Sequence, residues 1–334
     1  MTPLPPNART RPHILRFLTL AAVVLLVFTP LAGTMPAAHA QRGHKLKVVA
    51  SFSILGDWLT NVAGDYIDLN VLVPAGGDTH TFDPSPDQVA AIADADLVFE
   101  IGAGFEPWLD DIYDASGTTA KRVVVSNGVT LRTLDDPDAD EHGDADTHTH
   151  EDGASGSTDP HIWGNVQNAI IAVDNISRAL TLADPDMKAI YQSNAQAYIE
   201  QLQALDTAIK DSVAKLPADQ RRLVTSHDAL GYYCDAYGFT IVGTALGITT
   251  DEAEPSAKQV VNLIQQIEDA HVKAIFAENI ENPALMESIA KEAGVTIGPP
   301  LYTDALGEPG TDGDTYIKMM TFNTDAIVNA LLGQ

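Results

Sequence analysis

The feature that most limits how this chain can fold is a long amphipathic stretch near its middle, from Pro185 to Leu216. Its apolar residues recur in steps of three and four, which places them on one side of a single helix. Asp184 can cap its start, Pro185 suits the first helical position, and Pro217 marks its end. Such a helix is on the order of 45 Å long. We therefore expect a stiff connection between two halves of the chain.

Both halves read as alternating strands and helices, which is typical of parallel sheets with crossover helices. In the first half the predicted strands are residues 46–52, 67–73, 97–101 and 122–126. In the second half they are residues 223–226, 240–245, 274–277 and 295–298. The predicted fold class is α/β, with two lobes that each hold a parallel-type β-sheet with flanking helices. One long rigid helix joins them.

The N-terminus has the layout of a secretory signal. Arg9, Arg11 and Arg16 precede an apolar run at residues 17–28, and Ala38-His39-Ala40 fits the small-x-small cleavage rule. The apolar run is shorter than the roughly 20 residues that span a bilayer, which favours cleavage over retention as an anchor. We expect an exported protein, soluble after cleavage, in a periplasmic or other extracytoplasmic space.

The predicted domain boundaries follow from these features. A signal peptide covers residues 1–40, the N-terminal lobe 41–184, the linking helix 185–217 and the C-terminal lobe 218–334. Within the first lobe, residues 135–159 are rich in Asp, Glu, Gly, Ser and His and have almost nothing apolar. Such a segment cannot bury a core, so we expect a mobile loop there.

The charge and the cysteine content exclude several classes of partner. The formal net charge is -27, and removing residues 1–40, with three arginines and no acids, gives -27 - 3 = -30. A surface of this charge repels nucleic acid and anionic lipid head groups and favours cationic ligands. The single cysteine, Cys234, cannot form an intramolecular disulfide and lies far from the cleavage site. We expect a monomer that carries no lipid and binds no nucleic acid.

Four side chains that can bind metal lie in connections next to predicted strands or helix starts. His80, His227 and Asp304 follow strands, and His161 lies where the acidic segment gives way to a helical stretch. Ligands gather at the carboxyl ends of parallel strands, so the first three should face a common crevice. A lone histidine in a loop is more often structural, but three imidazoles and one carboxylate together suit tetrahedral zinc.

Five motifs carry a specific resemblance to a known family. In chain order they are Gly76-Gly-Asp-Thr-His-Thr-Phe-Asp-Pro-Ser-Pro86, Ile101-Gly-Ala-Gly-Phe-Glu-Pro-Trp-Leu109, Asp159-Pro-His-Ile-Trp163, Ser226-His-Asp-Ala-Leu-Gly-Tyr-Tyr233 and Thr303-Asp-Ala-Leu-Gly307. Together they resemble the zinc- and manganese-binding solute-binding proteins of ABC transporters, also called cluster A-I or cluster 9. The resemblance runs from about Leu46 to the final predicted helix. It implies a metal ion in a cleft between two α/β lobes, and delivery of that ion to a membrane permease.

The resemblance also implies the ligand set His80, His161, His227 and Asp304. Manganese-selective members often have a glutamate where this chain has His227, so the third imidazole resembles the zinc-type members. The preference of nitrogen donors for Zn²⁺ over Mn²⁺ points the same way. A manganese-specific protein of the same family is the alternative.

Zinc-type members often insert a loop rich in histidine and acid before the second ligand. Here His142, His148 and His150 lie among acidic residues at that place. Two interpretations remain open. The loop either collects zinc weakly near the cleft, or it is a solvated linker whose histidines bind nothing.

A zinc-dependent hydrolase is the alternative from a different class. Catalytic zinc keeps one coordination position open for water, whereas four protein ligands close the coordination sphere. Asp304 therefore separates the two functions, because it serves either as a fourth ligand or as a general base. We expect the closed sphere, with no catalytic residues and no enzyme activity.

Overall fold

The computed structural model describes residues 45–133, 158–250 and 255–334. The expected signal peptide at residues 1–40 lies outside the described residues, as do His142, His148 and His150. Among the residues described, no helix is both long enough and apolar enough to cross a membrane.

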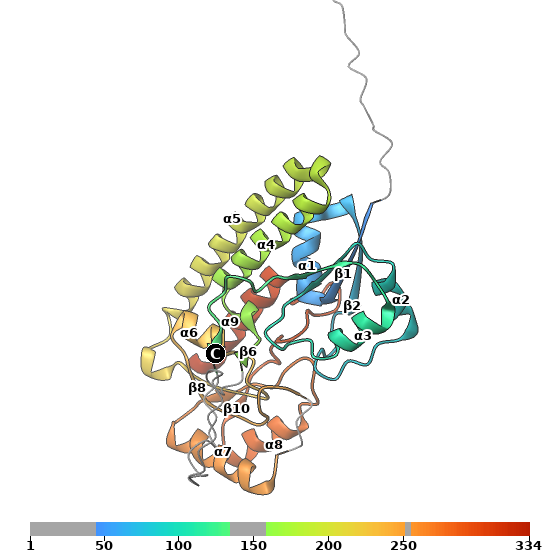
Figure 1. Ribbon diagram of the computed structural model, residues 1–334. Helices are drawn as coiled ribbons and strands as arrows, with labels where there is room; N and C mark the ends of the chain where they lie inside the picture. The colour runs from blue at the N-terminus through green and yellow to red at the C-terminus, as the bar shows by residue number, and fades with distance from the viewer. Residues whose placement is uncertain (1–44, 134–157, 251–254) are drawn as a thin grey trace, which may run out of the picture. The chain divides into compact units, whose positions relative to one another are not determined.

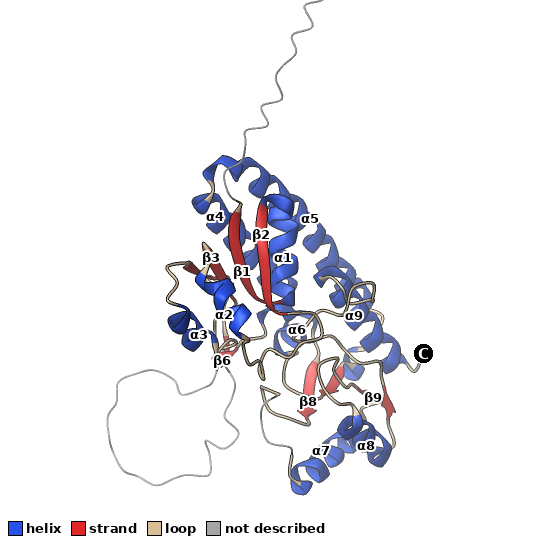
Figure 2. Ribbon diagram, turned by 90° about the vertical axis from the view of Figure 1, so that its right-hand side faces the viewer, coloured by secondary structure: helices blue, strands red, loops and turns tan. Residues whose placement is uncertain are grey.

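A parallel sheet of four strands in the order β2-β1-β3-β4 forms the centre of the first lobe. Its strands are β1 (Leu46–Phe52), β2 (Ile67–Val73), β3 (Leu97–Glu100) and β4 (Lys121–Val124). In the register, Leu46 lies opposite Ile67 and Val48 lies opposite Leu97. The connecting helices are α1 (Ser53–Ala63), α2 (Pro86–Ala93) and α3 (Leu109–Ser116), shown around the sheet in Figures 1 and 2. These strands agree with the predicted ones to within two residues at each end.

Both faces of this sheet are covered, and β1 shows how the sequence achieves it. Val48, Ala50 and Phe52 pack into a core with α1, whereas Val49 joins a second core that contains Ile92 of α2 and residues of α3. Successive side chains of a strand point to opposite faces. A strand buried on both faces therefore needs an almost unbroken apolar run, which β1 has.

The second lobe holds two parallel strand pairs, β7 (Arg222–Thr225) with β8 (Thr240–Thr244), and β9 (Ala274–Ile275) with β10 (Thr296–Ile297). The backbone N–H of Phe276 donates to the carbonyl of Val224 at 3.0 Å, which ties the pairs together. The helices are α6 (Gly231–Tyr237), α7 (Ala257–Asp269), α8 (Ala284–Ala293) and α9 (Tyr316–Leu332). The strands β9 and β10 are shorter than predicted because the chain leaves the ladder early. An isolated bridge between Glu278 and Leu301 continues it.

One long helix, α5 (Lys188–Val213), contacts elements of both lobes. It packs against α1 and α4 (Val166–Ala183) of the first lobe and against α6 and α9 of the second. Its buried stripe includes Tyr191, Tyr198 and Leu202, as the apolar spacing predicts. Its 26 residues extend about 39 Å. The helix is shorter than predicted, because Pro185–Met187 forms a separate 3-10 turn and the α-helix ends at Val213.

A short antiparallel hairpin closes the expected loop. Its strands are β5 (Arg132–Thr133) and β6 (Thr158–Asp159), with Arg132 opposite Asp159. This corrects the end of the segment expected to be mobile, residues 135–159. Asp159 is fully buried there, and its carboxylate accepts hydrogen bonds from Arg132 and His161 that offset the cost of burial. Residues 134–157 lie outside the described residues.

Candidate metal centre

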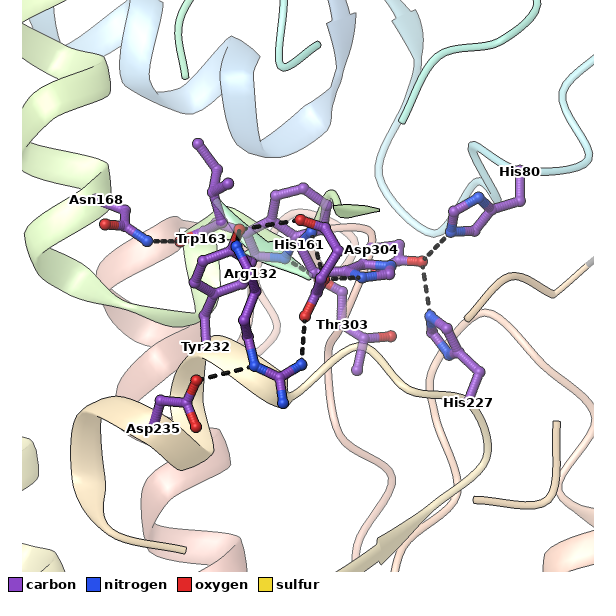
Figure 3. Close-up of polar contacts among 12 residues, drawn as sticks. His80, Arg132, His161, Trp163, Asn168, His227, Tyr232, Asp235, Thr303 and Asp304 are labelled. Atoms are coloured by element: carbon purple, nitrogen blue, oxygen red, sulfur yellow. Dashed lines mark hydrogen bonds and ion pairs between the residues drawn. The ribbon is translucent and has the colours of Figure 1, made fainter. Parts of the chain in front are cut away.

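Four buried side chains from separate loops converge at one point. His80, His161, His227 and Asp304 each offer one ligand atom, and these atoms all lie within 4.8 Å of one another. His80 comes from the loop after β2, His161 follows β6, and His227 follows β7. Figure 3 shows the rings of His80 and His227 pointing toward the carboxylate of Asp304.

The carboxylate of Asp304 lies at the centre of this group. Its Oδ2 is 3.0 Å from His80 Nε2 and 3.0 Å from His227 Nε2, and its Oδ1 is 3.6 Å from His161 Nε2. In the described part of the chain, His161 Nε2 and Asp304 Oδ1 are buried with no hydrogen-bond partner. A buried polar atom left unpaired costs about 1–3 kcal/mol. A cation bound among these atoms would remove that cost.

The charges of the centre shift its titration strongly. Burial alone would raise the pKa of Asp304, but the neighbouring His227 and His161 outweigh it and hold that pKa well below its usual range. Burial alone would lower the pKa of His161, but Asp304 and Asp159 raise it to about 9. Against the same burial penalty, Glu278 and Asp304 raise the pKa of His227 well above its usual range. Without metal, the rings of His161 and His227 therefore hold protons that a metal ion must displace.

A second carboxylate orients His161. Asp159 Oδ1 lies 2.9 Å from His161 Nδ1 and also accepts a hydrogen bond from the His161 backbone N–H at 3.0 Å. With Nδ1 held in this way, Nε2 faces Asp304. Histidines that bind metal are commonly oriented by such a carboxylate.

Glu278 has the corresponding role beside His227. Its Oε2 lies 2.5 Å from His227 Nδ1, and its Oε1 accepts from the His227 backbone N–H at 2.9 Å. The hydroxyl of Thr303 donates to Oε2 at 2.9 Å, so the neighbour of Asp304 also fixes this carboxylate.

The sequence reasoning missed both Asp159 and Glu278. Glu278 directly follows the predicted strand at residues 274–277. The rule that selected His227 and Asp304, a metal-binding side chain after a parallel strand, would therefore also have selected Glu278. Asp159 had a weaker signal, because it falls at the end of a segment that reads as a loop.

Hydrogen bonds fix the backbone of the loop that carries His80. Asp78 accepts from the backbone N–H of His80 at 2.9 Å and from the hydroxyl of Thr81 at 2.9 Å. Thr250 of the second lobe also donates to Asp78, at 2.7 Å. The indole N–H of Trp108 donates to the carbonyl of Thr79 at 2.9 Å. The ring of His80 is thus presented from a braced turn.

Aromatic side chains form an apolar wall beside the centre. The ring of Phe105 lies 5.2 Å from that of His80 and 6.0 Å from that of His161, centroid to centroid, and Trp163 packs against His161 at 5.3 Å. The indole N–H of Trp163 donates to the carbonyl of Thr303 at 2.8 Å. This wall excludes water and strengthens the electrostatic interactions inside.

The loop that carries Phe105 is tied down by a buried acid. Gly102, Ala103 and Gly104 all have positive φ, so the backbone turns sharply there. Glu106 accepts hydrogen bonds from the backbone N–H groups of Ile101 and Gly102. Its burial raises the pKa of Glu106 to about 7.

A family model described as the periplasmic zinc-uptake complex component A matches residues 48–330. Among curated relatives, a manganese-binding lipoprotein of Halalkalibacterium halodurans is 33% identical, over 92% of this chain and 96% of the relative. A manganese ABC transporter substrate-binding lipoprotein of Streptococcus mitis is 31% identical, over 94% of this chain and 98% of the relative.

Solved structures are similar over most of the chain. The periplasmic zinc binding protein of Treponema pallidum has a TM-score of 0.76 and 29% identity, covering 86% of this chain and 99% of that one. A manganese-bound periplasmic metal binding protein of Candidatus Liberibacter asiaticus has a TM-score of 0.73 and 26% identity, covering 85% and 98%. Both share the two-lobe α/β architecture.

Proposed function

The chain belongs to the family of the periplasmic zinc-uptake complex component A, and from this premise we propose that it captures Zn²⁺ outside the cytoplasm and delivers it to an ABC transporter permease. Its relatives are metal-binding components of ABC transporters and not enzymes. The chain is thus a metal-binding component of such a transporter, and the hydrolase alternative is not retained.

The observation that carries the choice of zinc is the composition of the donor set. We propose that His80, His161 and His227 bind the ion through Nε2 and that Asp304 supplies one carboxylate oxygen. Imidazole nitrogen suits Zn²⁺, whereas Mn²⁺ prefers sites rich in carboxylate, carbonyl and water oxygen. Four protein ligands also leave no position for a reactive water, which suits reversible capture.

Manganese is the second candidate metal. The curated relatives described above are named for manganese, whereas the similar structure from Treponema pallidum is named for zinc. The two proposals share the site and differ in the ratio of the two affinities.

A competition titration of the purified mature protein tests the choice. We expect Zn²⁺ to displace Mn²⁺ by a margin far larger than at a carboxylate-rich control site, because nitrogen donors already favour zinc at most sites. Elemental analysis of protein purified without added metal should find one zinc ion per chain. Equal affinities under matched conditions would reject the zinc assignment and favour manganese.

We further propose that the protein is exported, cleaved after Ala40 and soluble as a monomer. The curated relatives are named lipoproteins, but the single cysteine here, Cys234, is buried in α6 and cannot carry a lipid. Cell fractionation and the mass of the mature protein test this proposal. A membrane-bound form that retains residues 1–40 would contradict it.

The histidines His142, His148 and His150 are proposed as an accessory zinc collector. Hairpin β5–β6 brings the two ends of their segment together. Asp159 of that hairpin contacts His161, so the hairpin lies beside the metal centre.

A further inference from the structure

Arg132 joins two carboxylates from distant parts of the chain. Its Nη1 lies 3.0 Å from Asp159 Oδ2, and its Nε donates to Asp235 Oδ2 at 2.9 Å (Figure 3). The side chain of Asp159 is fully buried, whereas that of Asp235 is 65% exposed. A buried carboxylate needs a cation or hydrogen-bond donors. Arg132 is therefore a cation that compensates the charge of Asp159, in addition to the donors of His161.

The two oxygens of Asp159 connect Arg132 to the metal centre. Oδ2 accepts a hydrogen bond from the guanidinium of Arg132. Oδ1 accepts one from the backbone N–H of His161 and lies 2.9 Å from His161 Nδ1. The opposite ring nitrogen of His161, Nε2, lies 3.6 Å from Asp304 Oδ1. A line of direct contacts thus runs from Arg132 through Asp159 and His161 to Asp304.

Helix α6 contacts both Arg132 and Asp159 and fixes their positions. The hydroxyl of Tyr232 accepts from the backbone N–H of Arg132 at 2.9 Å and donates to the carbonyl of Asp159 at 3.0 Å. Asp235, about one turn later on the same helix, accepts a hydrogen bond from the guanidinium of Arg132. At Gly231, an added Cβ would lie 2.1 Å from Arg132 Nη1 and 2.6 Å from Asp159 Oδ2. The ion pair fills the space where any other residue would place a side chain.

We propose that Arg132 is a positioning residue of the metal centre, which acts through Asp159 to hold His161 with Nε2 toward the ion. This inference rests on the proposed function, because it takes His161 as a ligand. Arg132 itself contacts no member of the ligand set in the described structure. Its effect must pass through the orientation of one ring.

The chain offers a matched control in Arg122. Arg122 also joins a buried carboxylate, Glu100, and an exposed one, Asp110. In the described structure, none of these three residues hydrogen-bonds or ion-pairs with the four proposed ligands. Replacing Arg122 therefore removes the same kind of ion pair without touching the line of contacts to His161.

The first test measures the Zn²⁺ affinity of R132Q and R122Q by competition with a chelator. We expect R132Q to weaken binding by about 10-fold, the lower end of the range found when direct partners of metal-binding histidines are removed, because Arg132 acts through Asp159. We expect R122Q to remain within about 2-fold of the native protein. Co²⁺-loaded R132Q should also show an altered visible spectrum, because the geometry of the site changes. Native affinity in R132Q would overturn the proposal.

A double-mutant cycle tests whether the effect passes through Asp159. In the D159N background, R132Q should cause less than about 2-fold further loss, because the carboxylate it acts on is already gone. The same loss in both backgrounds would overturn the proposal. G231A provides a third route, since one methyl group displaces the ion pair without changing any charge. It should weaken binding in the same direction as R132Q.

Two further variants keep the test decisive. If R132Q does not fold, R132K is compared with R122K, because lysine keeps the charge but lacks the planar fork that reaches two carboxylates. A loss of about 3-fold or more in R132K alone supports the role, and equal affinities overturn it.

H161A separates the two proposals. Native affinity in H161A rejects the ligand set, whereas loss in H161A with none in R132Q rejects only the positioning role.

Discussion

His227 is the residue on which the choice of metal depends most directly. Its Nε2 faces Asp304 and its Nδ1 lies against Glu278. A glutamate at this position would supply a harder oxygen donor, but it would also place a second buried carboxylate beside Glu278. Two carboxylates in one buried site cannot both ionise easily.

We therefore expect H227E combined with E278Q to shift the ratio of Zn²⁺ to Mn²⁺ affinity toward manganese by at least about 10-fold, because one imidazole is replaced by a carboxylate. The variant H227E alone should shift it less, since the new acid stays partly protonated. E278Q alone is the control for the lost contact with His227. Titration with both metals measures the ratio. If the double variant keeps the native ratio, His227 is not a ligand.

The positions of His80, His227 and Asp304 after strands of parallel sheets predicted that these three side chains meet, and the family resemblance added His161. The sequence did not predict the carboxylates that orient the rings. Glu278 reaches His227 across 51 residues of sequence, and that contact depends on tertiary packing rather than on local spacing.

Helix α5 contributes to stability through a stripe that the sequence predicted. Its buried positions recur every three or four residues over 26 residues, and a stripe of this length is visible in the sequence alone. The hairpin β5–β6 escaped prediction because its strands have two residues each, too few to show any period. The strands predicted at residues 274–277 and 295–298 were too long, because the point at which a chain leaves its ladder depends on tertiary pairing.

Two leucine variants test the contribution of α5. Leu202 is fully buried in the main core, so L202A should lower the free energy of unfolding by about 2–5 kcal/mol. Leu182 of α4 is 72% exposed, so L182A should change it by less than about 0.5 kcal/mol. Urea denaturation of the metal-free protein measures both. Equal effects would show that the stripe of α5 does not stabilise the fold.

Deletion of residues 140–156 tests the accessory role of the loop. The cut keeps both strands of hairpin β5–β6, so Asp159 stays beside His161. We expect the tight site to keep its affinity, while zinc capture slows or fewer weakly bound ions are found. Stopped-flow binding and equilibrium dialysis measure these quantities. A deleted protein without the tight site would contradict the accessory role.

For the whole molecule, pH should act differently on the metal-free and zinc-loaded forms. In the metal-free form the pKa of His161 rises from 6.5 to about 9, so its proton stabilises the fold. That contribution is fully present below about pH 6.5 and is lost as pH rises through about 9. Zinc holds the proton off, so the loaded form lacks this dependence.

We expect the melting temperature of the metal-free protein to fall relative to that of the loaded protein between about pH 6.5 and 9. Zinc affinity should rise over the same window, because fewer protons compete. The buried Glu106, with its pKa near 7, affects both forms alike and cancels in the difference. Thermal melts and zinc titrations at several pH values provide the data. A constant difference across the window would contradict the protonated metal-free centre.

The four proposed ligands divide evenly between the halves of the chain, with His80 and His161 before α5 and His227 and Asp304 after it. With these ligands, each half alone would be a bidentate chelator, and two ligands would hold a metal ion weakly. The effective concentration of one pair at the other, which the stiff α5 sets, converts two weak chelators into one strong one. A small change in the distance between the halves would therefore change the affinity steeply, without altering any ligand.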